Sequence, residues 1–248
     1  MKTCVVLALF LMAGVSLGDI QKRVKDGRPC TADETKHFVF LGIKNQVIGS
    51  SFICSGTVID GNWVITAKHC KNDGWLGWIF SYFRYFQSKD VASTVDITST
   101  ETYQHDTADI MLIKVNTGMP AMPLVSEADC NKVLKQISPT KPVKMVVPAR
   151  HTKEEDTTGK DVSMCADINV NGRATMKDTN EEIVYWSPVG CDTCGGDSGA
   201  GYIYKNALFA VHTGTMKLDG QDKEENYGHI VCNGDIRKWI VKIMKDNP

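Results

Sequence analysis

The sequence has almost no net charge, because 28 Lys and Arg residues face 29 Asp and Glu residues in a chain of 248. Proteins that hold nucleic acid or an anionic membrane by electrostatic attraction carry a strong positive field. The charge balance therefore argues against both kinds of partner. The sequence also has no internal repeat and no low-complexity linker. With 42% hydrophobic residues, it has enough apolar material for a sizeable core.

Long hydrophobic runs are absent behind residue 18. The first 18 residues, MKTCVVLALFLMAGVSLG, hold one lysine, then an apolar run, then the small residues Ser16 and Gly18. This order is typical of a secretory signal peptide that is cleaved near Gly18. A membrane anchor would need a longer apolar run. We therefore expect a secreted, extracellular protein.

Sites for N-linked glycosylation are also absent, whereas cysteines are not. Of nine cysteines, Cys4 leaves with the signal peptide. An even number remains, which suggests disulfides in an oxidising compartment. Spacing alone cannot assign the pairs among these residues: Cys30, Cys54, Cys70, Cys130, Cys165, Cys191, Cys194 and Cys232.

Short runs of β-branched and aromatic residues fill the rest of the chain, separated by Gly, Asn, Asp and Pro clusters. They predict an all-β sandwich or barrel. The runs cover residues 38–43, 51–59, 63–67, 109–115, 143–149, 200–214 and 226–231. Only the end is expected to be helical, because apolar residues from 236 to 244 recur at helical spacing. The aromatic stretch 75–86 is either a buried strand pair or a partner-facing loop, and core packing is the better interpretation.

The stretch CDTCGGDSGAG, residues 191–201, holds a serine in a tight glycine-rich turn. A serine hydroxyl needs a base within hydrogen-bond reach, a group that fixes the tautomer of that base, and donors for the developing oxyanion. The N–H groups of Gly196 and Ser198 are candidate oxyanion donors. His69 in WVITAKHC is the candidate base, and Asp109 in ADIMLIKV is the candidate orienting acid. A buried acid at the start of an apolar strand is costly unless something pairs with it.

In the order His69, Asp109, Ser198, these motifs resemble the chymotrypsin/trypsin family of serine endopeptidases over essentially all of the mature chain. TAKHC is similar to the family's TAAHC, and GGDSGA to its GDSGG. Within the family, the resemblance is to trypsin-like enzymes of vertebrates, with a fish form as one candidate. It implies two packed six-stranded antiparallel β-barrels with a C-terminal helix. It also implies a Ser-His-Asp triad that works by acyl transfer.

The resemblance further implies that the chain is made as a zymogen. QKRVKDG is similar to an activation site, so that residues 1–18 are the signal peptide, 19–23 the propeptide and 24–248 the protease domain. Cleavage after Arg23 would create an ammonium at Val24 that pairs with buried Asp197. Lys25 lies where the family has an apolar residue, so its side chain must reach solvent or weaken insertion of the new N-terminus.

Substrate preference follows from the same resemblance. Asp192, six residues before Ser198, matches the acid that selects arginine or lysine by charge pairing. Gly214 matches the small residue on the pocket wall. His212 and Thr213 replace a serine and a tryptophan that line the substrate. The other pocket position is either Gly228 or, counting back from Cys232, Asn226, which would narrow the pocket.

By analogy with the family, the disulfides are Cys30–Cys165, Cys54–Cys70 and Cys130–Cys232. Cys191 and Cys194 lack the family's usual partner and could form a strained bridge, two thiols or an intermolecular bond. A zinc site from a single Cys-x-x-C is disfavoured by ligand count.

We therefore expect a secreted serine endopeptidase that cleaves after arginine or lysine. Its expected partners are protein or peptide substrates, an activating protease and protein inhibitors. We expect a monomer without cofactor or metal. The alternative is a catalytically weak or inactive homologue that acts as a binding protein. A metal-dependent hydrolase is disfavoured, because no His-Glu-x-x-His stretch occurs.

Overall fold

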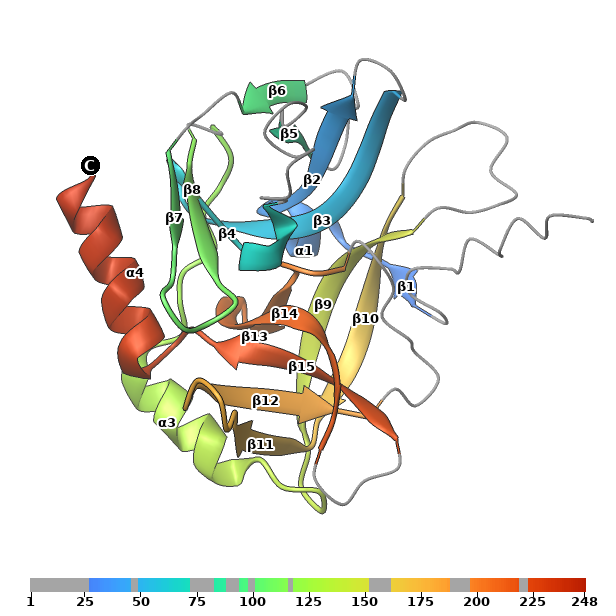
Figure 1. Cartoon of the computed structure of the whole chain (residues 1–248). Coiled ribbons are helices and arrows are strands. Elements are labelled where there is room, and N and C mark those ends of the chain that lie inside the picture. Colours follow the sequence, from blue (N-terminus) through green and yellow to red (C-terminus); the bar gives the residue numbers. More distant parts are fainter. Residues whose placement is uncertain are drawn as a thin grey trace, which may run out of the picture.

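Two antiparallel β-sheets and a C-terminal helix make up the computed structural model (Figure 1). It describes residues 27–45, 49–71, 83–87, 94–97, 101–115, 118–151, 162–187, 197–218 and 223–248. This arrangement confirms the predicted fold class. The described parts of the sheets hold seven and eight strands rather than six each, because short strands such as β1 and β7 extend their edges.

The first sheet carries the N-terminal half of the chain in the order β6-β5-β2-β3-β4-β8-β7. Its strands are β2 (Phe38–Asn45), β3 (Gly49–Asp60), β4 (Trp63–Thr66), β5 (Phe83–Gln87), β6 (Thr94–Ile97), β7 (Thr102–Gln104) and β8 (Met111–Lys114). The predicted runs 38–43, 51–59, 63–67 and 109–115 fall on β2, β3, β4 and β8. The predicted aromatic run 75–86 overlaps β5, but its side chains lie outside what the structure describes.

The second sheet has the order β1-β10-β9-β13-β14-β15-β12-β11. Its strands are β1 (Arg28–Pro29), β9 (Val143–His151), β10 (Val162–Val170), β11 (Gly172–Thr175), β12 (Glu182–Trp186), β13 (Gly201–Tyr204), β14 (Ala207–Lys217) and β15 (Glu224–Ile230). The run 200–214 is a hairpin of β13 and β14, with Lys205 and Asn206 at positive φ in its tight turn. β10, β11 and β12 were not predicted, although β10 alternates apolar and polar residues and β12 contains the short apolar run 183–186.

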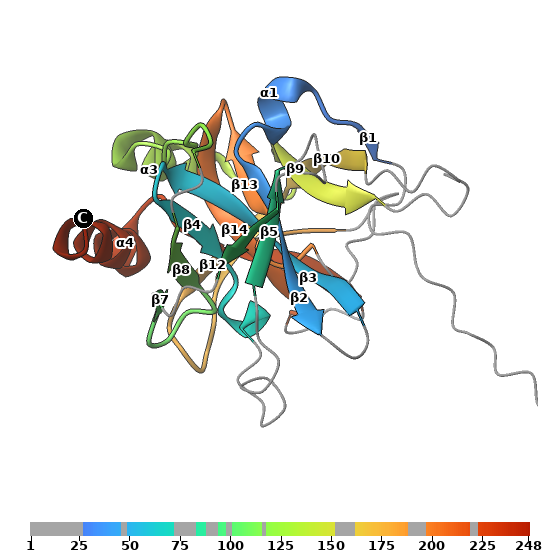
Figure 2. The same ribbon diagram turned by 90° about the horizontal axis from the view of Figure 1, so that it is seen from above.

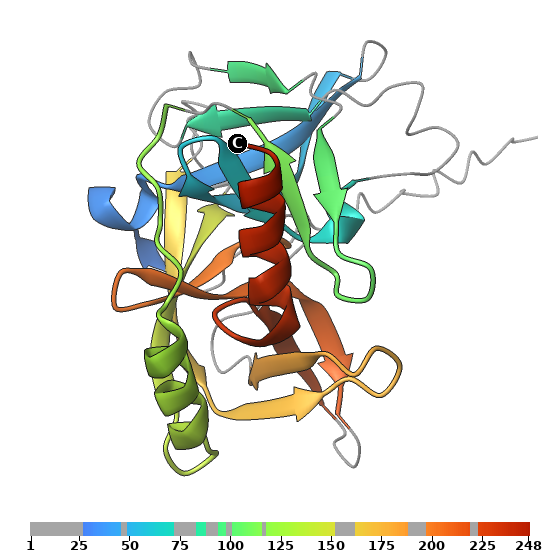
Figure 3. The same cartoon turned by 90° about the vertical axis from the view of Figure 1, so that its left-hand side faces the viewer.

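The predicted C-terminal helix is α4 (Gly234–Asp246), which buries Ile236 and Ile240. These two side chains belong to a cluster that also takes Trp63 and Leu112 from the first sheet and Val211 from the second. The helix therefore packs across the junction of the sheets (Figure 3). No helix in the described ranges is both long and apolar enough to cross a membrane.

The prediction that only the chain end is helical is wrong for α3 (Glu127–Gln136). Ser126 caps it by accepting the Asp129 N–H at 3.1 Å. Its apolar side is narrow, with Cys130, Val133 and Leu134 buried, and the remaining positions are polar or small. Such a stretch resembles a loop in sequence. A single-turn helix, α1 (Ala32–Thr35), was also missed. α3 and α4 lie on the same side of the molecule (Figure 2).

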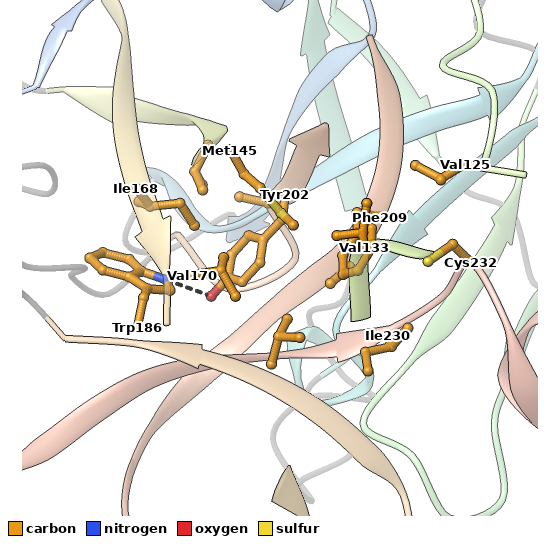
Figure 4. Packing of buried hydrophobic residues seen from close by; sticks show 14 of the residues in the cluster. Val125, Val133, Met145, Ile168, Val170, Trp186, Tyr202, Phe209, Ile230 and Cys232 are labelled. Carbon is orange, nitrogen blue, oxygen red and sulfur yellow. Dashed lines mark hydrogen bonds between the residues drawn. The ribbon is translucent and has the colours of Figure 1, made fainter. Parts of the chain in front are cut away.

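Each sheet also encloses apolar side chains of its own. The cluster of the second sheet includes Trp186, Tyr202 and Phe209 (Figure 4), and that of the first includes Leu41, Val64 and Met111. Three disulfides join Cys30 to Cys165, Cys54 to Cys70 and Cys130 to Cys232. They are the three pairs that the family resemblance implies. The second of them lies directly beside the candidate site.

Candidate active site

His69 lies in a short 3-10 turn, η1 (Lys68–Cys70), directly after β4. Cys70 is joined to Cys54 on β3, so the turn is fastened to the sheet on the side of the histidine. The Lys68 N–H donates to the Asp109 carbonyl at 3.2 Å, and the Lys68 ammonium donates to the His105 carbonyl at 3.0 Å. Lys68 thus has backbone partners on the acid-bearing segment, which accounts for a long side chain beside the histidine.

Asp109 holds the histidine with both carboxylate oxygens. Oδ2 accepts the His69 Nδ1–H at 2.6 Å, and Oδ1 accepts the His69 backbone N–H at 2.9 Å. Asp109 precedes β8, whose residue Met111 pairs with Thr66 of β4, so the sheet register brings the two segments together. Both the orientation and the tautomer of the ring are therefore fixed from one side, leaving Nε2 free to accept a proton.

The electrostatics of the pair favour the charged carboxylate. The hydrogen bond that the His69 ring donates to Asp109 raises the pKa of His69 above 6.5, although burial opposes this. For Asp109, burial is the largest single influence and raises its pKa. The hydrogen bonds from the His69 ring and amide lower the pKa of Asp109, and nearby positive charge lowers it further. Together these influences outweigh burial, so the net effect is a lowered pKa. The dyad thus behaves as a base with a supporting anion.

Ser198 lies in a turn that is hydrogen-bonded to both sheets. Its carbonyl accepts the Ser55 N–H of β3 at 2.8 Å, and the Gly199 N–H donates to the His212 carbonyl of β14 at 2.7 Å. Gly199 has φ 87°, and a Cβ there would lie 2.0 Å from the Ser55 carbonyl oxygen. Only glycine fits this position. The turn also buries Asp197 completely.

The structure brings His69 and Asp109 into contact, and it places both His69 and Ser198 next to the Cys54–Cys70 disulfide. The His69 ring lies within 4.8 Å of both sulfur atoms, and Cys70 Sγ lies 3.8 Å from the Ser198 carbonyl oxygen. Among the described side chains, none forms a hydrogen bond with Ser198 Oγ. The catalytic roles of the three residues stay predictions. The histidine and the two sulfurs do not form a metal site, because both sulfurs are used in the disulfide.

Of the predicted pocket residues, three are described. Gly214 lies on β14, and Asn226 and Gly228 lie on β15, where Asn226 is fully buried opposite Trp186. A Cβ at Gly228 would lie 2.7 Å from the Val211 carbonyl oxygen, so this position faces packed backbone. The remaining predicted site residues and cysteines lie outside the described ranges: Arg23, Val24, Lys25, Asp192, Gly196, Cys191 and Cys194.

Sequence reasoning missed a buried hydrogen-bond chain that ends at His212, the residue whose carbonyl accepts the Gly199 N–H. The Trp186 indole N–H donates to the Tyr202 hydroxyl at 3.0 Å (Figure 4), and that hydroxyl lies 2.9 Å from His212 Nδ1. Because an indole can only donate, the tyrosine O–H is left to donate to His212. Burial and the nearby charge of His69 lower the pKa of His212 to about 4. The sequence feature that could have revealed this chain is a histidine within the apolar run ALFAVHTG.

A second missed residue is His229 of β15, which is 1% exposed. Its Nε2 accepts the Asp109 backbone N–H at 3.4 Å. A polar residue at the centre of the predicted strand 226–231 was the available signal. The sequence could not reveal its partner, because the contact joins residues 120 positions apart.

Comparisons with known proteins agree on one family. The profile described as Trypsin matches residues 24–240. A beta-fibrinogenase from Macrovipera lebetinus is 27% identical over 241 residues, covering 90% of this chain and 88% of the relative. The venom plasminogen activator Haly-PA from Gloydius brevicauda is 29% identical over 238 residues, with the same coverage. Mouse brain neuropsin, a serine protease, superposes with a TM-score of 0.61 at 19% identity, covering 88% of this chain and 99% of its own.

Proposed function

The chain belongs to the trypsin family of serine endopeptidases, and from that premise we propose that it cleaves proteins through His69, Asp109 and Ser198. The observation that carries the triad is the double hydrogen bond of Asp109 to the His69 ring and amide, at 2.6 and 2.9 Å. The names of the relatives, which refer to fibrinogen and plasminogen, support protein substrates.

His69 Nε2 acts first as a base and then as an acid. It takes the hydroxyl proton as Ser198 Oγ attacks the substrate carbonyl carbon, and the C–N bond breaks as His69 returns that proton to the leaving amine. Water then attacks the acyl-enzyme by the same route. The N–H groups of Gly196 and Ser198 stabilise the oxyanion. Catalytic hydrogen bonds to the nucleophile are often long without substrate, so the open Ser198 hydroxyl agrees with this sequence of steps.

We also propose that the protein is synthesised as a secreted zymogen. Residues 1–18 are removed as a signal peptide, and cleavage after Arg23 releases residues 19–23. The new Val24 ammonium then pairs with Asp197. The complete burial of Asp197 supports this, because the attraction between an ammonium and a carboxylate is stronger in a buried, low-dielectric environment than in water.

Covalent labelling tests the activity. After limited cleavage behind Arg23, an organophosphate fluoride is expected to add one adduct at Ser198, measured by peptide mass spectrometry. Ser198→Ala is the control that takes no adduct. A folded, correctly cleaved protein that takes no adduct would favour the alternative, a catalytically inactive homologue that serves as a binding protein.

The specificity proposal assigns the choice of arginine or lysine to Asp192. Asp192→Ser is expected to lower kcat/KM for arginine substrates by about 10²-fold or more, because charge pairing in the pocket is lost. Labelling of Ser198 should persist. Cleavage profiling of a peptide library measures the preference, with exposed Asp178→Ser as the matched control. An unchanged preference would place the selecting acid elsewhere.

A further inference from the structure

His229 is a buried histidine that the proposed chemistry does not use, yet it contacts the acid of the dyad. It lies on β15 of the second sheet, whereas Asp109 precedes β8 of the first sheet. Its Nε2 accepts the Asp109 N–H at 3.4 Å. Asp109 is therefore held from two directions: its backbone contacts His229, and its carboxylate contacts His69.

The hydrogen bond fixes the protonation of the His229 ring. Nε2 faces an N–H donor, so it must offer a lone pair, and the proton of the neutral ring must lie on Nδ1. Nδ1 is buried and has no hydrogen-bond partner among the residues that the structure describes. An unpaired buried N–H costs free energy that an apolar ring of similar size would avoid. The hydrogen bond that Nε2 accepts from the Asp109 N–H is therefore what a histidine offers here and an apolar ring does not.

The surroundings of His229 favour the neutral ring. Burial is the largest influence and lowers the pKa of His229 to about 4, helped by the positive charges of His105 and Lys68. The carboxylates of Asp109 and Glu181 act in the opposite direction without overcoming it. The Tyr227 ring also lies beside it, 6.1 Å away between centroids. A protonated ring would set an N–H against the Asp109 N–H and place a second cation beside the carboxylate.

We propose that His229 is a positioning residue: its neutral imidazole anchors the Asp109 peptide so that the carboxylate stays aligned with His69. The proposal rests on the proposed role of Asp109 in orienting His69. His229 touches neither the substrate nor the reacting atoms. It acts by holding the peptide from which the carboxylate projects, across the junction between the two sheets.

Two substitutions separate this role from simple packing. His229→Phe keeps a ring but removes the acceptor, and it should lower kcat of the cleaved enzyme about tenfold with KM within about twofold, because misplaced catalytic groups slow the chemical step. His229→Gln keeps an acceptor at similar reach and should retain most of kcat. The matched control is His37→Phe, which removes another buried histidine whose ring makes no hydrogen bond to His69 or Asp109. Wild-type kcat in His229→Phe, or an equal loss in both His229 variants, would overturn the proposal.

Nitrogen-15 NMR of the cleaved Ser198→Ala protein tests the positioning role of His229 without an activity measurement. His229 should show the tautomer with its proton on Nδ1, and the pKa of His69 should fall in His229→Phe but not in His37→Phe. A proton on Nε2 of His229, or an unchanged His69 titration, would overturn the positioning role. Absence of organophosphate labelling in the wild type would instead overturn the proposed function, so the two failures are distinguishable.

Discussion

Replacing Asp109 with asparagine is expected to lower kcat by about 10⁴-fold, the size of loss that the same change causes in a related triad. The structure gives the reason. The His69 backbone N–H can only donate, so the single amide oxygen of asparagine would stay with it at the position of Oδ1. The amide NH₂ would then face His69 Nδ1, which would have to accept. The proton would move to Nε2, where it blocks uptake of the Ser198 proton.

The pH dependence of this variant provides an independent measurement. Asp109 raises the pKa of His69 above its ordinary 6.5, and only neutral His69 can act as a base. The acid limb of kcat should therefore lie above pH 6.5 in the wild type and move to lower pH in Asp109→Asn. Asp106→Asn, an exposed acid three residues away, is the matched control. A loss of kcat below about tenfold, with no shift of the limb, would contradict an orienting role for Asp109.

Mild acid is expected to destabilise the protein steeply between pH 6.5 and about pH 4. Three buried histidines, His37, His212 and His229, have pKa values lowered from 6.5 to about 4, with burial as the main cause. In this window the unfolded chain binds protons that the folded chain does not, so the free energy of unfolding falls as pH falls. Each histidine contributes a slope of about 1.4 kcal/mol per pH unit.

Other titratable groups change the free energy of unfolding mainly at pH values outside this window. His69 has a raised pKa and acts in the opposite sense, because its contribution is fully present below 6.5 and is lost as pH rises through its folded pKa. The lowered carboxyl pKa values, such as that of Glu34 at about 2, contribute to acid loss only below about pH 4.5. His69 therefore changes stability only above pH 6.5, and it does not offset the loss that the three buried histidines cause between pH 6.5 and about 4.

His37→Phe tests this prediction, because neither nitrogen of the His37 ring has a hydrogen-bond partner in the described part of the chain. Urea unfolding at pH 7 and pH 5 should show that the variant loses less stability on acidification than the wild type, by on the order of 2 kcal/mol. Exposed His69→Phe, by contrast, should steepen the loss. Equal losses in the wild type and His37→Phe would show that His37 titrates normally.

The sequence predicted the features whose determinants are local. The short apolar runs around Val64 and Leu112, the glycine turn at Ser198 and the apolar side of α4 all lie in short windows. The sequence did not predict α3, because only three of its ten residues are buried and its capping serine resembles a loop residue. The contact of His229 with Asp109 depends on how two sheets dock, and no window of the chain contains both. The same holds for the Trp186–Tyr202–His212 chain, which three strands assemble.

The place of β15 in its sheet also bears on the order in which the protein is made. β15 is the last strand of the chain, yet it lies between β14 and β12 in the sheet. α4, which joins the two sheets, follows it. A ribosome delivers the chain from its N-terminus. The second sheet therefore stays open until β15 has been made, and the dyad gains its support from His229 only after all the other strands of both sheets have been synthesised.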